Sequence, residues 1–202
     1  MLAAIGDVHG QYSALRKIIE ELPSGCLPVV IGDIFDKGPN SREVLRLLQD
    51  TEHIRILGNH DRMAIDAHSS QTSRLRWLLS GGRFTLDSFG GRMPDEALEF
   101  LAGAQLWAEE EGMLFVHAGI RPGRALSEQT ERDLTTIRHP FLLASETGFD
   151  TPIVFGHTPL LRPWVRPDRI GCDTGAGLGF SLTAIVLEGG RPIHEISVAI
   201  DD

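Results

Sequence analysis

Short apolar runs alternate with amphipathic segments over the first sixty residues. The runs span residues 2–5, 27–31 and 54–57, and their length is typical of buried strands. Each is followed by a loop and then by apolar residues at helical spacing, in residues 11–22, in residues 41–48 and from about His60 onward. Three consecutive strand–loop–helix units predict an α/β fold with a parallel sheet and right-handed crossovers.

The pattern changes in the second half of the chain. Residues 70–103 indicate short helices around 77–79 and 96–101, separated by paired glycines, and suggest no function. Four further strands are predicted at 113–116, 153–155, 181–187 and 193–199, and the Gly-containing turn 188–191 makes the last two an antiparallel hairpin. Because no low-complexity linker divides the chain, we expect one domain over residues 1–202.

Composition narrows the class of protein. A hydrophobic fraction of 42% in 202 residues is enough to build a substantial core. No apolar run approaches the roughly 20 residues that a membrane span needs, and Met1 leads directly into structured sequence, so we expect a cytoplasmic protein with no membrane partner. Cys26 and Cys172 stand alone without CxxC spacing, which favours two reduced thiols over a disulfide or a thiolate zinc site.

The chain is acidic, with 19 basic and 28 acidic residues and a net charge of -9. Nucleic-acid binding depends on clustered Lys and Arg, so no nucleic-acid partner is expected. An anionic substrate stays compatible with this charge, because carboxylates that hold metal ions enter the formal count while the loaded site attracts anions.

Five predicted strands are each followed by a potential metal ligand, and a glycine usually stands between the strand and the ligand. The carboxyl ends of parallel strands share one edge of a sheet, where ligands bind, so these residues should converge there. The set is Asp7, His9, Asp33, Asn59, His117 and His157. One Gly-Asp pair after a strand is usually only a turn, and it is the alignment of five strand ends that favours a site.

The donor types indicate the chemistry. Mixed oxygen and nitrogen donors suit Mn, Fe or Zn better than Ca or Mg. Asp7 and His9 are two residues apart, so on an extended backbone they point the same way. A carboxylate such as Asp33 can bridge two ions about 3.5–4 Å apart, and a water between them is a nucleophile at neutral pH. The pattern therefore predicts a hydrolase with two divalent metal ions.

Other polar motifs receive plainer interpretations. His53, His68, His139 and His194 do not follow apolar runs, and we interpret them as surface or hydrogen-bonded core residues. Cys172-Asp173-Thr174-Gly175 is interpreted as a turn that shapes the cleft. The GxGxG stretch at 175–179 is a weak signal for a phosphate loop, because no helix follows it.

Five segments, 6–10, 32–38, 58–61, 117–119 and 156–158, resemble in order and spacing the PPP-type (calcineurin-like) metallophosphatase signature GDxHG, GDxxDRG, GNH[ED], H[AG] and GHT. The resemblance runs through nearly the whole chain and is strongest to the small bacterial and bacteriophage lambda serine/threonine protein phosphatases, which residues 77–82 and 173–176 also resemble. It implies two facing mixed β-sheets, a β-sandwich core, flanked by helices.

The resemblance also implies roles. One metal would be held by Asp7, His9 and the bridging Asp33, and the second by Asp33, Asn59, His117 and His157, with Mn²⁺ favoured over Fe or Zn. His60 matches the acid that protonates the leaving oxygen. Asp36 matches the carboxylate that orients this acid, and a positioned acid is typically worth about 10²- to 10⁴-fold in rate. Arg138 matches the arginine that clamps phosphate in the lambda-like enzymes.

Two positions depart from the family pattern. Lys37 stands where the family usually has arginine; it keeps the charge but lacks the planar fork, so we expect weaker substrate orientation. Asp61 stands where protein phosphatases more often have Glu and symmetrical dinucleoside tetraphosphatases have Asp.

The resulting prediction is a serine/threonine protein phosphatase, with tyrosine as a further target, acting by direct attack of a metal-bridging hydroxide without a phosphoenzyme. Its partner would be a phosphorylated protein or peptide, and a monomer is favoured. The main alternative is a symmetrical dinucleoside tetraphosphate hydrolase, supported by His60-Asp61 and residues 119–122. A nuclease is disfavoured by the acidic chain, and a silent binding module by the intact ligand set.

Overall fold

A five-stranded mixed sheet carries the N-terminal half of the site. The computed structural model describes residues 1–200, and its strand order in this sheet is β10-β9-β1-β2-β3. The strands are β1 (Leu2–Ile5), β2 (Leu27–Val30), β3 (Ile54–Arg55), β9 (Ser181–Glu188) and β10 (Arg191–Ala199). β1, β2 and β3 run parallel, as predicted, whereas the C-terminal hairpin β9–β10 adds to β1 in the antiparallel direction.

A second five-stranded sheet has the order β4-β5-β6-β8-β7. Its strands are β4 (Trp107–Glu110), β5 (Met113–Val116), β6 (Ile153–Phe155), β7 (Trp164–Val165) and β8 (Arg169–Gly171). The three central strands β5, β6 and β8 are parallel, and the two edge strands β4 and β7 are antiparallel to their neighbours. The carboxyl ends of β5 and β6 therefore lie at the same edge of this sheet.

The two sheets pack face to face because their side chains alternate with period two. Leu2 and Ala4 of β1 contact a core cluster that includes Phe115 of β5, whereas Ile5 of β1 belongs to a cluster on the helical side. Leu114 of β5 likewise faces a third cluster on the outer side of the second sheet. The expected α/β sandwich of two mixed sheets flanked by helices is confirmed.

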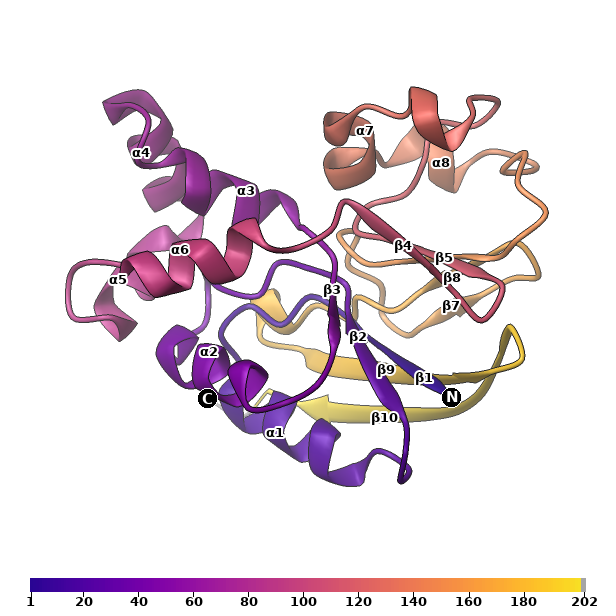
Figure 1. Ribbon diagram of the computed structural model, residues 1–202, viewed down its shortest axis with the longest axis horizontal. Coiled ribbons are helices and arrows are strands. Elements are labelled where there is room, and N and C mark those ends of the chain that lie inside the picture. The colour runs from indigo at the N-terminus through magenta and orange to yellow at the C-terminus, as the bar shows by residue number, and fades with distance from the viewer. Residues whose placement is uncertain (201–202) are drawn as a thin grey trace.

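The helices form the two outer layers, seen in Figure 1 at the left and lower left and at the upper right. The first layer covers the outer face of the first sheet, and α7 and α8 cover the second sheet. The first layer contains α1 (Tyr12–Glu21), α2 (Ser41–Gln49), α3 (Asn59–Asp66), α4 (Gln71–Trp77), a π-helical turn (Leu78–Gly82), α5 (Arg83–Ser88) and α6 (Asp95–Ala102). The other elements are α7 (Glu131–Thr136), α8 (His139–Leu142) and 3₁₀ turns at Leu126–Glu128 and Ala176–Leu178.

The predicted apolar strands are confirmed within two residues, but three strands were missed. β4 contains exposed residues and two glutamates, and β7 and β8 are only two and three residues long, so none shows an apolar run. The expectation that the ligand-bearing strands share one sheet edge is wrong. Three belong to the first sheet and two to the second, and the stacking of the sheets brings their ends together.

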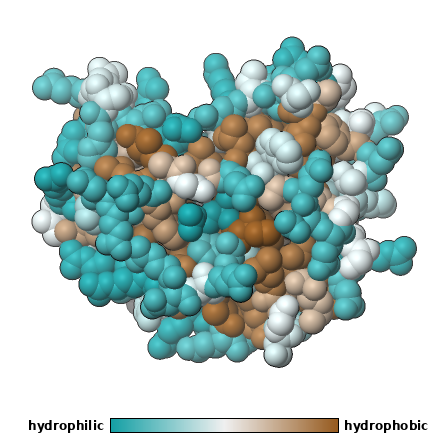
Figure 2. All heavy atoms as spheres, in the orientation of Figure 1, coloured by the Kyte–Doolittle hydropathy of each residue, from teal (hydrophilic) through white to brown (hydrophobic). Residues whose placement is uncertain are grey.

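The surface and the thiols agree with the composition. Figure 2 shows hydrophilic side chains over much of one face, with hydrophobic ones gathered toward its middle. Cys26 and Cys172 are both free, as their isolated positions predict. Among residues 1–200, no helix is both long and apolar enough to cross a membrane.

Candidate metal centre and catalytic pocket

The six predicted ligands are placed around one locus by strand ends from both sheets. Asp7 and His9 follow β1, Asp33 follows β2, and Asn59 begins α3 after β3. His117 follows β5 and His157 follows β6. A cavity of about 280 Å³ lies here. Its lining is Asp7, His9, Asp33, Lys37, Asn59, His60, Arg138, His157, Pro159, Asp173, Gly175, Gly177 and Leu178. His117 is fully buried behind it.

The backbone at the site is held in the left-handed region of φ and ψ, which residues other than glycine rarely adopt. Five site residues have φ between 47° and 70°: His9, Asp33, Asp36, Lys37 and His157. Such conformations cost of order 1–3 kcal/mol each and persist only where the surrounding fold imposes them. The strand ends therefore turn sharply to aim consecutive side chains into the cavity.

The glycines before the ligands allow the close approach of neighbouring strand ends. A Cβ at Gly58 would overlap the backbone nitrogen and carboxylate of Asp33. A Cβ at Gly156 would overlap the carboxylate of Asp7. The Gly-ligand pattern thus has a steric cause at these two positions, where each glycine makes room for a predicted ligand that follows another strand.

Two histidine rings are oriented by backbone carbonyls. Nδ1 of His9 lies 2.9 Å from the carbonyl oxygen of Phe35, and Nδ1 of His117 lies 2.7 Å from that of Ile31. Both contacts direct Nε2 toward the carboxylate of Asp33, at 3.6 Å from His9 and 3.5 Å from His117. A histidine whose other ring nitrogen is held by a carbonyl is the usual arrangement of a metal ligand.

The donor atoms fit two metal ions. His9, Asp33 and His60 offer one set of atoms within 4.8 Å of one another, and Asp33, His117 and His157 offer a second. His60, predicted as the acid, thus belongs to the first set, whereas Asp7, predicted as a ligand, belongs to neither. Asp33 belongs to both sets, which suits a bridging carboxylate. Buried carboxylates without cations are costly, and Asp7, Asp33 and Asp173 are each at most 3% exposed. The site is therefore chemically suited to divalent cations.

Protonation states also suit metal binding. Burial lowers the pKa of His9 to about 3, and Asp33 only partly offsets this effect. Burial likewise lowers the pKa of His157 to about 3, with the neighbouring His117 acting in the same direction. Both imidazoles are neutral at pH 7, and neutral imidazole is the form that donates to a metal.

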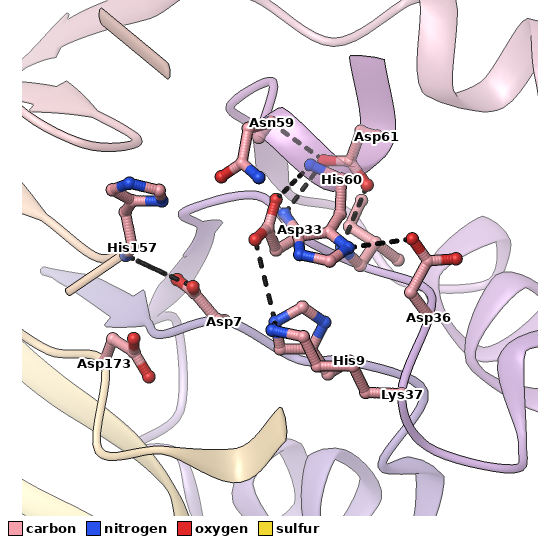
Figure 3. A network of polar contacts seen from close by, with 12 residues as sticks. Asp7, His9, Asp33, Asp36, Lys37, Asn59, His60, Asp61, His157 and Asp173 are labelled. Atoms are coloured by element: carbon pink, nitrogen blue, oxygen red, sulfur yellow. Dashed lines mark hydrogen bonds and ion pairs between the residues drawn. The ribbon is translucent and has the colours of Figure 1, made fainter. Parts of the chain in front are cut away.

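His60 and Asp36 form a hydrogen-bonded pair beside the predicted metal ligands, shown in Figure 3. Nδ1 of His60 lies 2.9 Å from Oδ2 of Asp36, so its other ring nitrogen is available to the cavity that His60 lines. Burial lowers the pKa of His60, but Asp33 and the hydrogen bond to Asp36 outweigh it, so the net shift is upward. The pair can hold a proton near neutral pH.

Asp36 is itself fixed by residues of the middle segment, whose role the sequence did not indicate. Trp77 donates its indole N–H to the carboxylate at 3.0 Å, and the Thr85 hydroxyl donates to Oδ1 at 2.7 Å. The backbone N–H of Asp36 donates back to the Thr85 oxygen at 2.9 Å. Asp36 has no exposed surface. Residues 71–88 thus enclose the carboxylate behind His60.

Asp61 has a positioning role away from the cavity. Its carboxylate accepts the backbone N–H groups of Asp33, Ile34 and Gly58 at 2.9–3.0 Å. It is 1% exposed and does not line the cavity, and burial raises its pKa to about 7. Asp61 therefore ties the second and third strand ends together. The Asp/Glu difference at this position acts on the loop that carries Asp33, without a contact to substrate.

Two cations approach the cavity from opposite sides. Arg138 is exposed and donates to Nε2 and the carbonyl oxygen of His157 at 3.1 and 3.2 Å. Nζ of Lys37 lies 2.9 Å from Nε2 of His9, a contact it would give up to a metal at that nitrogen. The Lys37 stem passes close to Gly81 and Gly177, where no side chain could fit.

Asp173 was assigned only to a turn, but its side chain reaches the cavity. It is 3% exposed, lines the cavity beside Asp7 and points inward in Figure 3. One oxygen accepts the N–H of Gly175 at 2.9 Å. By contrast His53, His68, His139 and His194 do not line this cavity, as predicted. No spacing signal distinguishes Asp173 from an ordinary turn residue, so only the tertiary structure reveals it.

Comparison with known proteins identifies the family that this chain resembles. Residues 1–183 match the family described as calcineurin-like phosphoesterase. The chain is 34% identical over 197 residues to serine/threonine-protein phosphatase 1 of Salmonella typhimurium, with 89% of this chain and 88% of that protein covered.

It is 28% identical to the asymmetrical bis(5'-nucleosyl)-tetraphosphatase PrpE of Halalkalibacterium halodurans, with 90% and 87% covered. A crystal structure provisionally named as a diadenosine tetraphosphatase superposes with a TM-score of 0.75 at 23% identity, covering 98% of this chain and 92% of that one.

Proposed function

The chain belongs to the calcineurin-like phosphoesterases, and from this premise we propose that it is a metal-dependent phosphoprotein phosphatase acting on phosphoserine and phosphothreonine. The carrying observation is that Asp33 belongs to two donor sets and that His60, a member of one of them, is hydrogen-bonded to Asp36. Such a site can bind a phosphate monoester and deliver a proton to its leaving oxygen. The relative in Salmonella typhimurium, which covers most of the chain, supports the protein-phosphatase assignment.

In this proposal the metals are held by Asp7, His9, Asp33, Asn59, His117 and His157. Two divalent ions in these ligands, Mn²⁺ in the first instance, supply Lewis acidity and a nucleophilic water at neutral pH. Hydrolysis is direct, so the chain provides no covalent nucleophile. Neither cysteine lines the cavity, which agrees with this scheme.

Substrate binding and proton transfer are assigned to side chains other than the metal ligands. Arg138, exposed at the mouth beside His157, binds the phosphoryl oxygens with its guanidinium fork. Lys37 contributes a point charge from the other side. His60 gives its proton to the departing seryl or threonyl oxygen, and Asp36 keeps the imidazole oriented and protonated.

The test compares two substrate classes on the Mn²⁺-loaded protein. Phosphoserine and phosphothreonine peptides should be hydrolysed with higher kcat/KM than diadenosine tetraphosphate. Asp33→Asn and His60→Asn are the site controls and should lose most activity on every substrate. Dominant turnover of the dinucleotide would overturn the proposal, and a stoichiometric phosphoenzyme in an acid quench would overturn direct hydrolysis.

The second candidate is a dinucleoside tetraphosphate hydrolase. It is favoured by the PrpE relative, which covers 90% of the chain and is named for the asymmetrical reaction. The cavity lining itself contains no Phe, Tyr or Trp to stack a base, which supports the phosphoprotein assignment. The substrate comparison above separates the two.

A further inference from the structure

We propose that a second, basic pocket beside the catalytic cavity binds acidic side chains that flank the phosphorylated residue, so that the substrates are acidic phosphoproteins. This inference rests on the proposed phosphoprotein phosphatase function and specifies its substrate class. The pocket has a volume of about 650 Å³. Its lining includes Arg121, Arg124, Arg132, Asp133 and Arg138.

The pocket is continuous with the site through one residue. Arg138 lines both the catalytic cavity and the basic pocket. It immediately precedes α8, whose backbone is anchored by the fully buried Arg169 through the carbonyl oxygen of Phe141. A substrate whose phosphate meets Arg138 therefore places its neighbouring residues over this pocket.

The charge of the pocket is opposite to that of the chain. Its lining holds four arginines and one aspartate, whereas the whole chain has 19 basic and 28 acidic residues. Asp133 pairs with Arg121, whose Nη2 lies 2.5 Å from Oδ1. The charge of Arg121 is therefore neutralised, and the other arginines leave the pocket with a net positive charge.

The nearby carboxylates are committed elsewhere. Glu131, next to Arg132 in α7, pairs with Nε of Arg62 at 2.6 Å. Glu128 accepts the backbone N–H of Ala125 at 3.2 Å. Within residues 1–200, Arg124 and Arg132 are exposed and take part in no ion pair. Their guanidinium groups are free to meet anions from outside.

The lining chemistry favours carboxylates over a nucleotide. Guanidinium forks bind carboxylates and phosphates through paired hydrogen bonds. Recognition of a nucleobase relies on stacking against aromatic faces, and the pocket lining has no Phe, Tyr or Trp. An acidic peptide flank needs only charge and hydrogen-bond donors, and the pocket supplies both.

The test uses two phosphothreonine peptides that differ only in their flanks, Glu in one and Gln in the other. The wild type should hydrolyse the Glu peptide with kcat/KM roughly 3- to 10-fold higher, since exposed ion pairs are individually weak. The double variant Arg124→Gln/Arg132→Gln should lose this preference and keep its rate on p-nitrophenyl phosphate. Raising the salt concentration from about 0.05 to about 0.3 M should erode the wild-type preference.

The matched control is Arg46→Gln/Arg191→Gln, which removes the same charge from exposed positions on α2 and β10. This variant should retain the preference for Glu flanks. The pocket assignment is overturned if wild type shows no preference, or if the pocket variant keeps it. If instead phosphopeptides are not hydrolysed and diadenosine tetraphosphate is, the proposed function fails. A loss of that activity in the pocket variant would then identify the pocket as a polyphosphate site and overturn the peptide assignment.

Discussion

Replacing Thr85 by valine tests whether the middle segment supports the acid pair. Valine has nearly the same shape, and Thr85 is fully buried, so packing changes little. The substitution removes the donor to Oδ1 of Asp36 at 2.7 Å and the acceptor for the Asp36 backbone N–H at 2.9 Å. It thus deletes two hydrogen bonds to one buried residue while leaving His60 untouched.

The expected loss of stability is about 2.5 kcal/mol. A hydrogen bond to a charged group contributes about 1.5–3 kcal/mol, and a buried N–H without a partner costs about 1–3 kcal/mol. The low end of this sum applies, because the indole N–H of Trp77 still donates to both Asp36 oxygens. The matched variant Thr85→Ser keeps the hydroxyl and loses one methyl group, which should cost only about 1 kcal/mol.

Urea unfolding measures the stability difference, and leaving-group dependence measures the function. A loosened Asp36 should slow hydrolysis of phenyl phosphate, whose leaving oxygen needs a proton, by about tenfold or more. Hydrolysis of p-nitrophenyl phosphate, with its good leaving group, should change little. If Thr85→Val is no less stable than Thr85→Ser, and both substrates slow equally, Thr85 does not position the acid pair.

Four further changes probe the remaining contacts. Gly58→Ala should weaken Mn²⁺ binding at least about tenfold by calorimetry, since its Cβ overlaps Asp33; unchanged affinity would contradict the steric argument. Asp173→Asn should lower Mn²⁺ affinity about 10- to 100-fold with the fold intact by circular dichroism; wild-type affinity would return Asp173 to a turn role. In metal-free protein, His9 stays neutral when folded because burial lowers its pKa to about 3, whereas the unfolded imidazole gains a proton below about pH 6.5. Its contribution to stability is therefore lost as pH falls, and His9→Gln should gain about 2 kcal/mol relative to wild type between pH 7.5 and 5; a pH-independent difference would show an exposed or charged ring. Lys37→Arg should raise kcat/KM on p-nitrophenyl phosphate through its fork, and an unchanged or lower value would refute weak orientation by lysine.

The parts of the fold that sequence predicted are those in which local pattern and tertiary environment agree. Strands such as β1 and β5 are buried on both faces, so their sequences are continuous apolar runs. β4 fails this rule because it is an edge strand with three of four residues exposed. The second sheet was therefore only partly visible, and the ligand-bearing strands were expected at a single sheet edge.

The same distinction separates the site residues that the sequence predicted from those that it missed. The predicted metal ligands follow strand ends at fixed spacing, so their residue types and order were sufficient to select residues that the structure brings together around one cavity. The contacts that hold Asp36 join residues 41 and 49 positions apart, to Trp77 and Thr85. Nothing in the local pattern of the middle segment marks those two side chains, because their partner lies on another element. Asp173 was missed as a cavity residue for the same reason.

In our proposals, the residues that carry out the reaction and the residues that select the substrate lie on different elements of the molecule. The strand ends supply ligands and the acid pair, and they require glycines and left-handed backbone that leave a recognisable pattern. In our proposal the substrate faces the wall formed by α7, α8 and the loop before them, where Arg124 and Arg132 need only an exposed position and a free charge. Such a wall can change its charge without disturbing the strand ends. This separation would allow relatives of one chain to carry the names of a protein phosphatase and of a tetraphosphatase.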